Sequence, residues 1–175
     1  MVVREDRKEL IIDNAVGIFA EKGYYKATTA MVAAGAGVTQ PYVFHFFRNK
    51  EELFNAVVTR AAGRICEIFN RIEAPADRLM DTMGNAFLQI MSTHRDEILL
   101  LMQAYTIAEP GIRAVVREKF GMIYDEVVAK FEQARVPNVR EAASQFMGTG
   151  LLIAQSEVLE LPRLLWCNHK AAQPE

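Results

Sequence analysis

The chain has 175 residues, 51% of them hydrophobic, which is enough apolar material for a sizeable core in one domain or in a small head joined to a larger helical body. A formal net charge of −2 does not by itself indicate a nucleic-acid-binding protein. The charged N-terminal segment lacks the apolar core of a signal peptide, and no apolar run approaches the roughly 20 residues of a membrane span, so we expect a cytoplasmic protein with no membrane partner.

The first expected element is an amphipathic helix from about Arg4 to Glu21, whose apolar residues recur at helical spacing. Gly23 should end it. A short second helix follows, with Thr29 as its expected N-cap. Gly35 and Gly37 then bracket a tight turn, where glycine adopts positive φ at little steric cost.

The third expected helix is short and rich in hydrogen-bonding and aromatic side chains. Thr39 is placed to cap it, and Pro41 suits an early helical position, where its missing N–H is not needed. Two short helices joined by a glycine turn are typical of a helix-turn-helix, whose second helix lies in the major groove of DNA.

Residues 7–54 resemble the DNA-binding region of the TetR family of bacterial transcription regulators. The spacing of several residues carries this resemblance, and the matching positions are Ala15, Phe19, Gly23, Thr29, Ala33, Gly37, Val38, Thr39, Phe47, Lys50, Leu53 and Phe54. One position departs from the family. Phe44 stands where the family usually has a tyrosine that reaches a phosphate, and Tyr42 or His45 could substitute for it.

The resemblance implies a DNA-binding domain at residues 1–48 and a helical ligand-binding and dimerisation domain at residues 49–175. In the first domain, Thr39, Gln40, Tyr42 and His45 are expected to face the groove, next to Pro41. An amide side chain such as Gln40 can read an adenine edge. Thr29, Tyr42 and Lys50 are expected to hold phosphates and fix the register on double-stranded operator DNA.

The remaining elements are also expected to be helices, which predicts an all-α fold. Asn49 should cap a long fourth helix that reaches Arg71 and connects head to body. Further helices are expected after Pro75, over residues 95–106, from Pro110 onward and over residues 139–159. A short last helix should follow Pro162.

The helix over residues 139–159 carries glycines at 148 and 150, each costing about 1 kcal/mol relative to alanine. One interpretation is that a second copy of the chain approaches here, making a homodimer interface. The alternative is close packing inside one chain. The TetR resemblance favours the dimer, whose expected interface residues are Ser144, Gly148, Leu151, Leu152, Gln155 and Leu159.

Methionine and aromatic side chains are spread over several helices of the body. Apolar stripes at helical spacing are usually plain core, but they can also line a cavity for a small hydrophobic ligand, for which methionine is well suited. The resemblance favours a pocket for some of them; the candidates are Met83, Phe87, Met91, Met102, Tyr105, Phe120, Tyr124 and Phe146.

No catalytic constellation, metal-ligand spacing or phosphate-cradling loop is present in the sequence, so neither an enzyme nor a metal or other cofactor is expected. The resulting hypothesis is a homodimeric TetR-like regulator, most often a repressor, released by an apolar or aromatic inducer that shifts the fourth helix. The alternative is a helical small-molecule-binding protein or enzyme whose head no longer binds DNA.

Overall fold

The computed structural model describes residues 2–165, which form eight α-helices, two short 3-10 helices and no strand. The predicted all-α fold is therefore confirmed. The elements in chain order are α1 (Val2–Lys26), α2 (Thr29–Gly35), α3 (Gln40–Phe44), α4 (Lys50–Arg71), α5 (Ala76–Thr93), α6 (Arg95–Gln103), η1 (Ala104–Thr106), α7 (Pro110–Gln133), α8 (Val139–Val158) and η2 (Pro162–Leu165).

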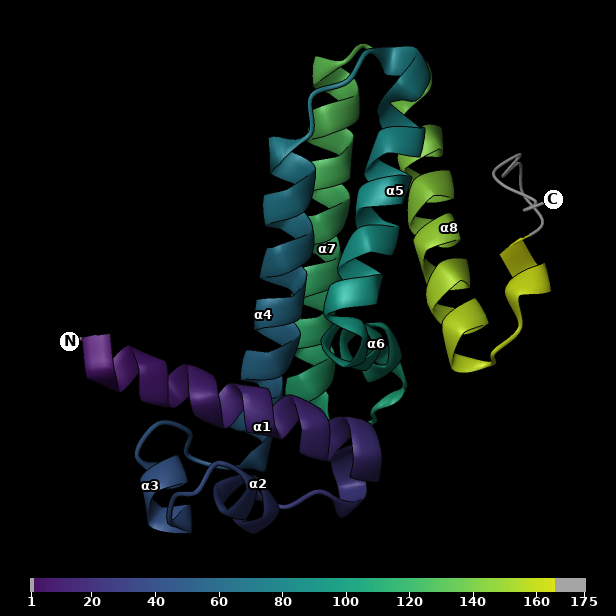
Figure 1. Cartoon of the computed structure of the whole chain (residues 1–175). Coiled ribbons are helices and arrows are strands. Elements are labelled where there is room, and N and C mark those ends of the chain that lie inside the picture. Colours follow the sequence, from purple (N-terminus) through teal and green to yellow (C-terminus); the bar gives the residue numbers. More distant parts are fainter. Residues whose placement is uncertain (1, 166–175) are drawn as a thin grey trace, which may run out of the picture.

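Helix α1 crosses the lower end of the body, and α2 and α3 lie on its other side (Figure 1). The predicted end at Gly23 is confirmed in part. Gly23 has the non-helical angles φ 71° and ψ 163°, but one further helical turn continues to Lys26. Because L side chains rarely adopt this positive φ, glycine suits the break.

The turn between α2 and α3 follows the predicted helix-turn-helix pattern, with Gly37 at φ 65°. The predicted cap of α2 is wrong by one residue. Thr28, not Thr29, has the extended backbone of an N-cap, and its Oγ1 accepts a hydrogen bond from Met31 N at 3.2 Å. Thr39 occupies the N-cap position of α3, but its side chain makes no capping bond.

Helix α4 begins where the sequence places it. Asn49 Oδ1 accepts a hydrogen bond from Glu52 N at 2.8 Å, and Glu52 Oε2 accepts one from Arg48 N at 2.7 Å. Together these bonds satisfy two backbone donors at the helix start, much as a capping box does. The long helix runs from the head into the body, where it packs most extensively against α7.

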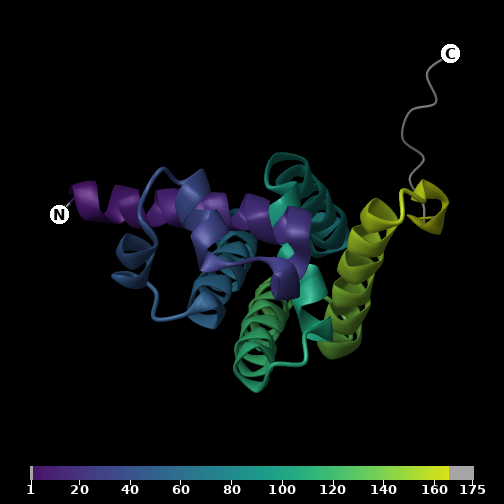
Figure 2. The same cartoon turned by 90° about the horizontal axis from the view of Figure 1, so that it is seen from below.

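The body is built from α4 to α8. Helices α4, α5, α7 and α8 run side by side, and α6 lies beneath them next to α1 (Figure 1). Seen from below, α8 lies at the edge of the body farthest from α3 (Figure 2). The helix predicted over residues 95–106 stops at Gln103 and continues as the 3-10 turn η1.

Burial follows the predicted apolar stripes, with one continuous core that includes Phe19, Phe54 and Phe131. Phe19 and Phe54 pack edge to face with ring centroids 5.0 Å apart, which joins α1 to α4. Across residues 2–165, none of the helices is both long enough and apolar enough to traverse a lipid bilayer.

Candidate nucleic-acid interface and ligand cavity

The predicted groove-facing residues of α3 are exposed together. The N-cap, the first turn and the C-cap of α3 contribute them, and they are Thr39, Gln40, Pro41, Tyr42 and His45. The rings of Tyr42 and His45 are stacked, with centroids 6.4 Å apart. Val43, in contrast, is fully buried and anchors the helix in the head. One side of α3 therefore packs inward, while the other offers polar and aromatic groups to a partner.

Gln40 is already engaged within the head. Its Nε2 donates to Thr29 Oγ1 at 2.9 Å, which ties α3 to α2. Thr29 is only 7% exposed, so the structure does not present it as a direct phosphate contact. A buried hydroxyl that holds Gln40 in place suits a positioning role for Thr29, because one rotamer of the amide is then favoured.

Lys50 is also placed differently from the sequence expectation. Its Nζ donates to the carbonyl oxygens of Tyr24, at 2.9 Å, and Tyr25, at 3.3 Å. The same ammonium group lies 4.5 Å from the centroid of the Tyr24 ring. Lys50 thus fastens the end of α1 to the start of α4, and these contacts compete with a phosphate contact.

Arg48 is a basic residue that the sequence reading passed over. It is exposed in the turn between α3 and α4, and its side chain forms no ion pair within residues 2–165. The turn after a recognition helix is close to the phosphate backbone when that helix enters a major groove. The sequence spacing of the family pattern indicated Lys50 as the phosphate contact. The fold shows that Lys50 is held by backbone carbonyls, whereas the Arg48 side chain is exposed and available for a phosphate.

An ionic cluster joins the head to the body. Arg60 on α4 contacts Glu9 and Asp13 on α1, each at 2.8 Å, and Glu97 on α6 at 2.7 Å. Arg64 reaches Glu97 as well, at 3.3 Å. Burial lowers the pKa of Arg60, but the hydrogen bonds to Glu97, Glu9 and Asp13 outweigh it, so the net pKa is raised. Arg60 therefore stays charged wherever the protein is folded.

A second link joins the end of α1 to the loop before α7. Tyr25 Oη donates to Glu109 Oε2 at 2.9 Å and accepts a bond from Ala108 N at 3.3 Å. Glu109 and Glu51 also raise the pKa of the neighbouring Tyr24, after the larger effect of burial. The start of α7 is thus connected to α1 through Tyr25, in addition to the packing of α7 against α4.

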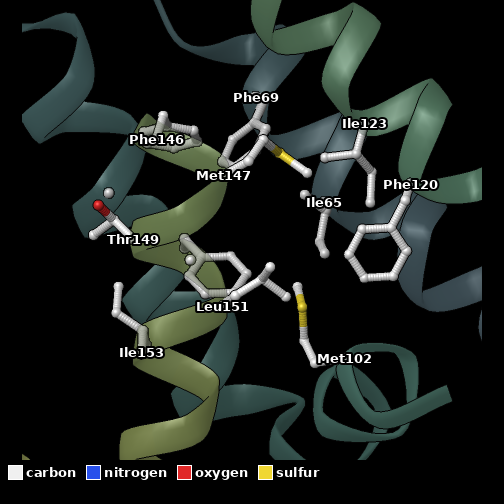
Figure 3. A pocket seen from close by; sticks show the side chains of 13 residues that line it. Ile65, Phe69, Met102, Phe120, Ile123, Phe146, Met147, Thr149, Leu151 and Ile153 are labelled. Carbon is white, nitrogen blue, oxygen red and sulfur yellow. The ribbon is translucent and has the colours of Figure 1, made fainter. Parts of the chain in front are cut away.

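The body contains an apolar cavity of about 40 Å³ between α4, α5, α6, α7 and α8. Side chains from these helices converge on it in Figure 3. Its lining is apolar apart from one threonine: Ile65, Phe69, Gly84, Phe87, Met102, Phe120, Ile123, Phe146, Met147, Thr149, Gly150, Leu151 and Ile153. Pockets for drug-sized ligands measure about 300–1,000 Å³, so the cavity is collapsed as it stands.

Four of the eight predicted pocket residues line this cavity: Phe87, Met102, Phe120 and Phe146. Met83 and Met91 are buried but do not line it, and Tyr124 is half-buried elsewhere. Tyr105 is 60% exposed and lines the adjoining groove beside α7 instead of this cavity. The candidate list from the sequence contains no residue of α4, although Ile65 and Phe69, four residues apart, lie on its buried apolar face.

Two open grooves, each about 390 Å³, adjoin the cavity and share Leu151 with it. One lies beside α7 and is lined by Tyr105, Arg113, Val116, Arg117, Phe120 and Leu151. The other follows α8, with Gly148, Leu152 and Gln155 among its lining residues. Leu151 of α8 thus stands at the border of all three spaces.

The predicted dimer residues form an exposed or half-buried stripe along α8 and its C-cap: Ser144, Gly148, Leu151, Leu152, Gln155 and Leu159. Leu159 is 55% exposed, although it is a large apolar side chain. A Cβ added at Gly148 would meet no atom within 4 Å, so packing inside one chain does not require glycine there. At Gly150 the nearest such contact is Phe87 Cε1 at 4.0 Å.

Comparison with known proteins supports the reading of the head. Residues 11–57 match the family described as bacterial regulatory proteins, tetR family. The chain is 26% identical over 130 residues to the HTH-type transcriptional regulator YhgD of Bacillus subtilis, covering 73% of this chain and 68% of that protein. It is 36% identical over 62 residues to the HTH-type transcriptional repressor AcnR of Corynebacterium diphtheriae, covering 35% of this chain and 33% of the repressor.

Solved structures show the same fold over nearly the whole chain. Salmonella enterica GusR superimposes with a TM-score of 0.74 at 17% identity, covering 93% of this chain and 96% of that one. FadR from Bacillus subtilis in complex with stearoyl-CoA gives a TM-score of 0.71 at 18% identity, covering 92% and 99%. At these identities the similarity shows the fold alone.

Proposed function

Because its DNA-binding region places this chain in the tetR family of bacterial regulatory proteins, we propose that it is a repressor whose hold on operator DNA is released by a small apolar or aromatic ligand. Residues 1–48 form the DNA-binding domain in this proposal, and residues 49–175 the ligand-binding and dimerisation domain. The observation that carries the proposal is a helix-turn-helix linked by two sets of polar contacts to a body with an apolar cavity.

DNA recognition is assigned to the exposed side of α3. Tyr42 and His45 offer hydrogen-bonding aromatic groups, and the Gln40 carbonyl oxygen stays available while its amide nitrogen bonds to Thr29. A five-residue helix exposes too few groups to grip a site tightly alone. Two heads held one helical turn of DNA apart, about 34–36 Å, would supply the rest, which requires a dimer.

The homodimer is assigned to the exposed stripe of α8. Its support is the open space at Gly148 and the exposed leucines Leu151 and Leu159. Exposed apolar side chains gathered on one helix are typical of an interface. Leu151 also borders the ligand cavity, so the same helix would sense the ligand and hold the partner subunit.

The coupling between ligand binding and release of the DNA is assigned to α6. Met102, near its C-terminal end, lines the cavity, and Glu97, five residues earlier, binds Arg60. A ligand that enlarges the 40 Å³ cavity must push its lining outward, and the shift of α6 would then reach both α4 and α1 through Arg60. The ligand acts only through its differential affinity for the two arrangements of the heads.

A gel-shift assay on DNA from the protein's own promoter region, over a range of salt concentrations, tests the proposal. The expected result is a specific complex whose affinity falls steeply with salt. Adding candidate ligands, among them neutral aromatic compounds, fatty acids and fatty acyl coenzyme A thioesters, should identify one that lowers this affinity. A protein that binds such compounds but retains no specific DNA complex would instead support the ligand-binding or enzymatic alternative.

A further inference from the structure

Arg113 and Arg117 line the open groove beside α7 together with Tyr105, Val116, Phe120 and Leu151. Both arginines are exposed, and in the part of the chain that the structure describes neither forms an ion pair. The acidic residues of the ionic cluster, Glu9, Asp13 and Glu97, are committed to Arg60 and Arg64. No acidic side chain lines the groove itself, and Glu118, Asp125 and Glu126 share a separate, shallow surface with Arg117.

The two arginines stand four residues apart on one face of α7. Like charges at this spacing repel and destabilise an isolated helix. An anion held between two guanidinium groups removes that repulsion and accepts their charge-assisted hydrogen bonds.

The charged groove continues into the apolar cavity. Phe120 and Leu151 line both the groove and the cavity, so the two spaces meet at these side chains. At about 1.5 Å of rise per residue, Arg117 lies about 4.5 Å along the α7 axis from Phe120, and Arg113 about 10.5 Å. A molecule whose apolar part enters at Phe120 would bring its other end to the arginines.

We propose that the ligand is an amphiphile with an apolar chain or ring system and an anionic group, and that Arg113 and Arg117 bind the anionic group. This inference depends on the proposed ligand cavity and adds the class of molecule that fills it. A neutral hydrocarbon would fill the cavity but leave both guanidinium groups unused. Carboxylate and phosphate share the required chemistry, and an experiment can separate them.

The test compares two fluorescent probes with the same ring system. The anionic probe is 1-anilinonaphthalene-8-sulfonate, and the neutral probe is N-phenyl-1-naphthylamine. Titration of the full chain gives a Kd for each. In the Arg113→Gln/Arg117→Gln variant, the Kd of the anionic probe should rise at least about tenfold, because charge-assisted hydrogen bonds are lost. The Kd of the neutral probe should stay within about twofold, since no charge is involved.

The matched control is Arg78→Gln/Arg140→Gln, which removes the same net charge from exposed positions that do not line this groove. It should leave both Kd values unchanged. An equal rise in this control would show a general charge effect and overturn the site. Phe87→Ala, inside the cavity, should weaken both probes. If Phe87→Ala weakens both but the Arg113/Arg117 variant changes neither, only the anion site fails; if Phe87→Ala affects neither probe, the proposed cavity fails.

Competition identifies the anionic group. Dodecanoate, dodecyl phosphate and uncharged 1-dodecanol carry the same chain and are titrated against the bound anionic probe. The proposal expects at least one anion to displace it at concentrations about tenfold lower than the alcohol does. The stronger of the two anions distinguishes a carboxylate from a phosphate ligand. Displacement by the alcohol at the same concentrations as the anions would contradict the inference.

Discussion

The Nε of Arg60 lies 2.7 Å from Oε1 of Glu97, a pair that connects the helix leaving the head to the helix beneath the apolar cavity. Glu97 is 4% exposed, although most charged residues of the chain lie at the surface. A carboxylate this deeply buried is stable only with its charge paired and its hydrogen bonds made. The pair therefore fixes how α4, α6 and α1 sit relative to one another.

Glu97→Ala should destabilise the protein by roughly 3 kcal/mol, since it leaves Arg60 and Arg64 without their buried acceptor. Thermal unfolding should show a Tm lower by about 6–12 °C. The control is Glu67→Ala, whose partner Arg71 lies 3.9 Å away with both side chains more than two-thirds exposed. An exposed pair of this kind contributes about 0–1 kcal/mol. Equal Tm values for the two variants would mean that the buried pair is unimportant.

Lys50→Ala should mainly lower the thermal stability, whereas Arg48→Ala should mainly change the salt dependence of DNA binding. Loss of Lys50 removes two hydrogen bonds to the carbonyls of Tyr24 and Tyr25 and should lower Tm by a few degrees. Loss of Arg48, which is exposed, should leave Tm unchanged but flatten the dependence of log K on log salt by about one unit. Fluorescence anisotropy on a fixed DNA duplex measures the slope. If Lys50→Ala flattened the salt dependence and Arg48→Ala did not, Lys50 and not Arg48 would be the phosphate contact.

Gly148→Leu should disrupt the dimer without harming the single chain. A side chain at this position meets no atom of its own chain within 4 Å, and leucine favours a helix over glycine by roughly 1 kcal/mol. Light scattering should show a shift toward monomer, and DNA affinity should fall with it. Gly121→Leu on α7 is the matched control, because it is equally unobstructed and lies off the proposed interface. A Gly148→Leu protein that remains as tight a dimer as this control would move the interface elsewhere.

Phe120→Ala and Phe131→Ala should separate ligand binding from core stability. Phe120 is half-buried and lines the cavity, whereas Phe131 is fully buried and does not line it. Phe131→Ala should cost about 3–5 kcal/mol of stability. It should raise the Kd of N-phenyl-1-naphthylamine for the folded protein only slightly, because the ring of Phe131 packs on the cavity-lining Phe146, with centroids 5.9 Å apart, but does not line the cavity itself. Phe120→Ala should raise that Kd with a smaller loss of Tm. Parallel losses in both variants would make these residues ordinary core.

The sequence predicted most of the fold because local signals determine it. Asn49 and Glu52 mark the start of α4, glycine at 37 marks the turn of the helix-turn-helix, and Pro110 opens α7. The assignment of Thr29 as a cap failed because Thr28 precedes it with the same chemistry, so only backbone angles decide between the two.

The site was less predictable because it depends on contacts between distant segments. Periodicity places Met83 and Phe87 on one face of α5, yet only Phe87 reaches the cavity. The partners of Lys50 lie about 25 residues away along the chain, and Glu97 is 37 residues from Arg60. No spacing rule reveals such pairs. Likewise, only the structure shows that Arg48 and Arg113 are exposed, whereas Lys50 and Arg60 are held in contacts within the protein.

Selection of bound sequences from a random duplex library, followed by affinity measurement on the enriched site, tests the central claim most directly. The account predicts an inverted repeat whose half-sites lie one or two helical turns apart, bound at least about 10³-fold more tightly than random duplex. Tyr42→Ala, on the exposed side of α3, should weaken binding to this site, whereas Tyr124→Ala in the body should not. Failure to enrich any sequence, with equal affinity for all duplexes, would contradict the assignment of this protein as a DNA-binding regulator.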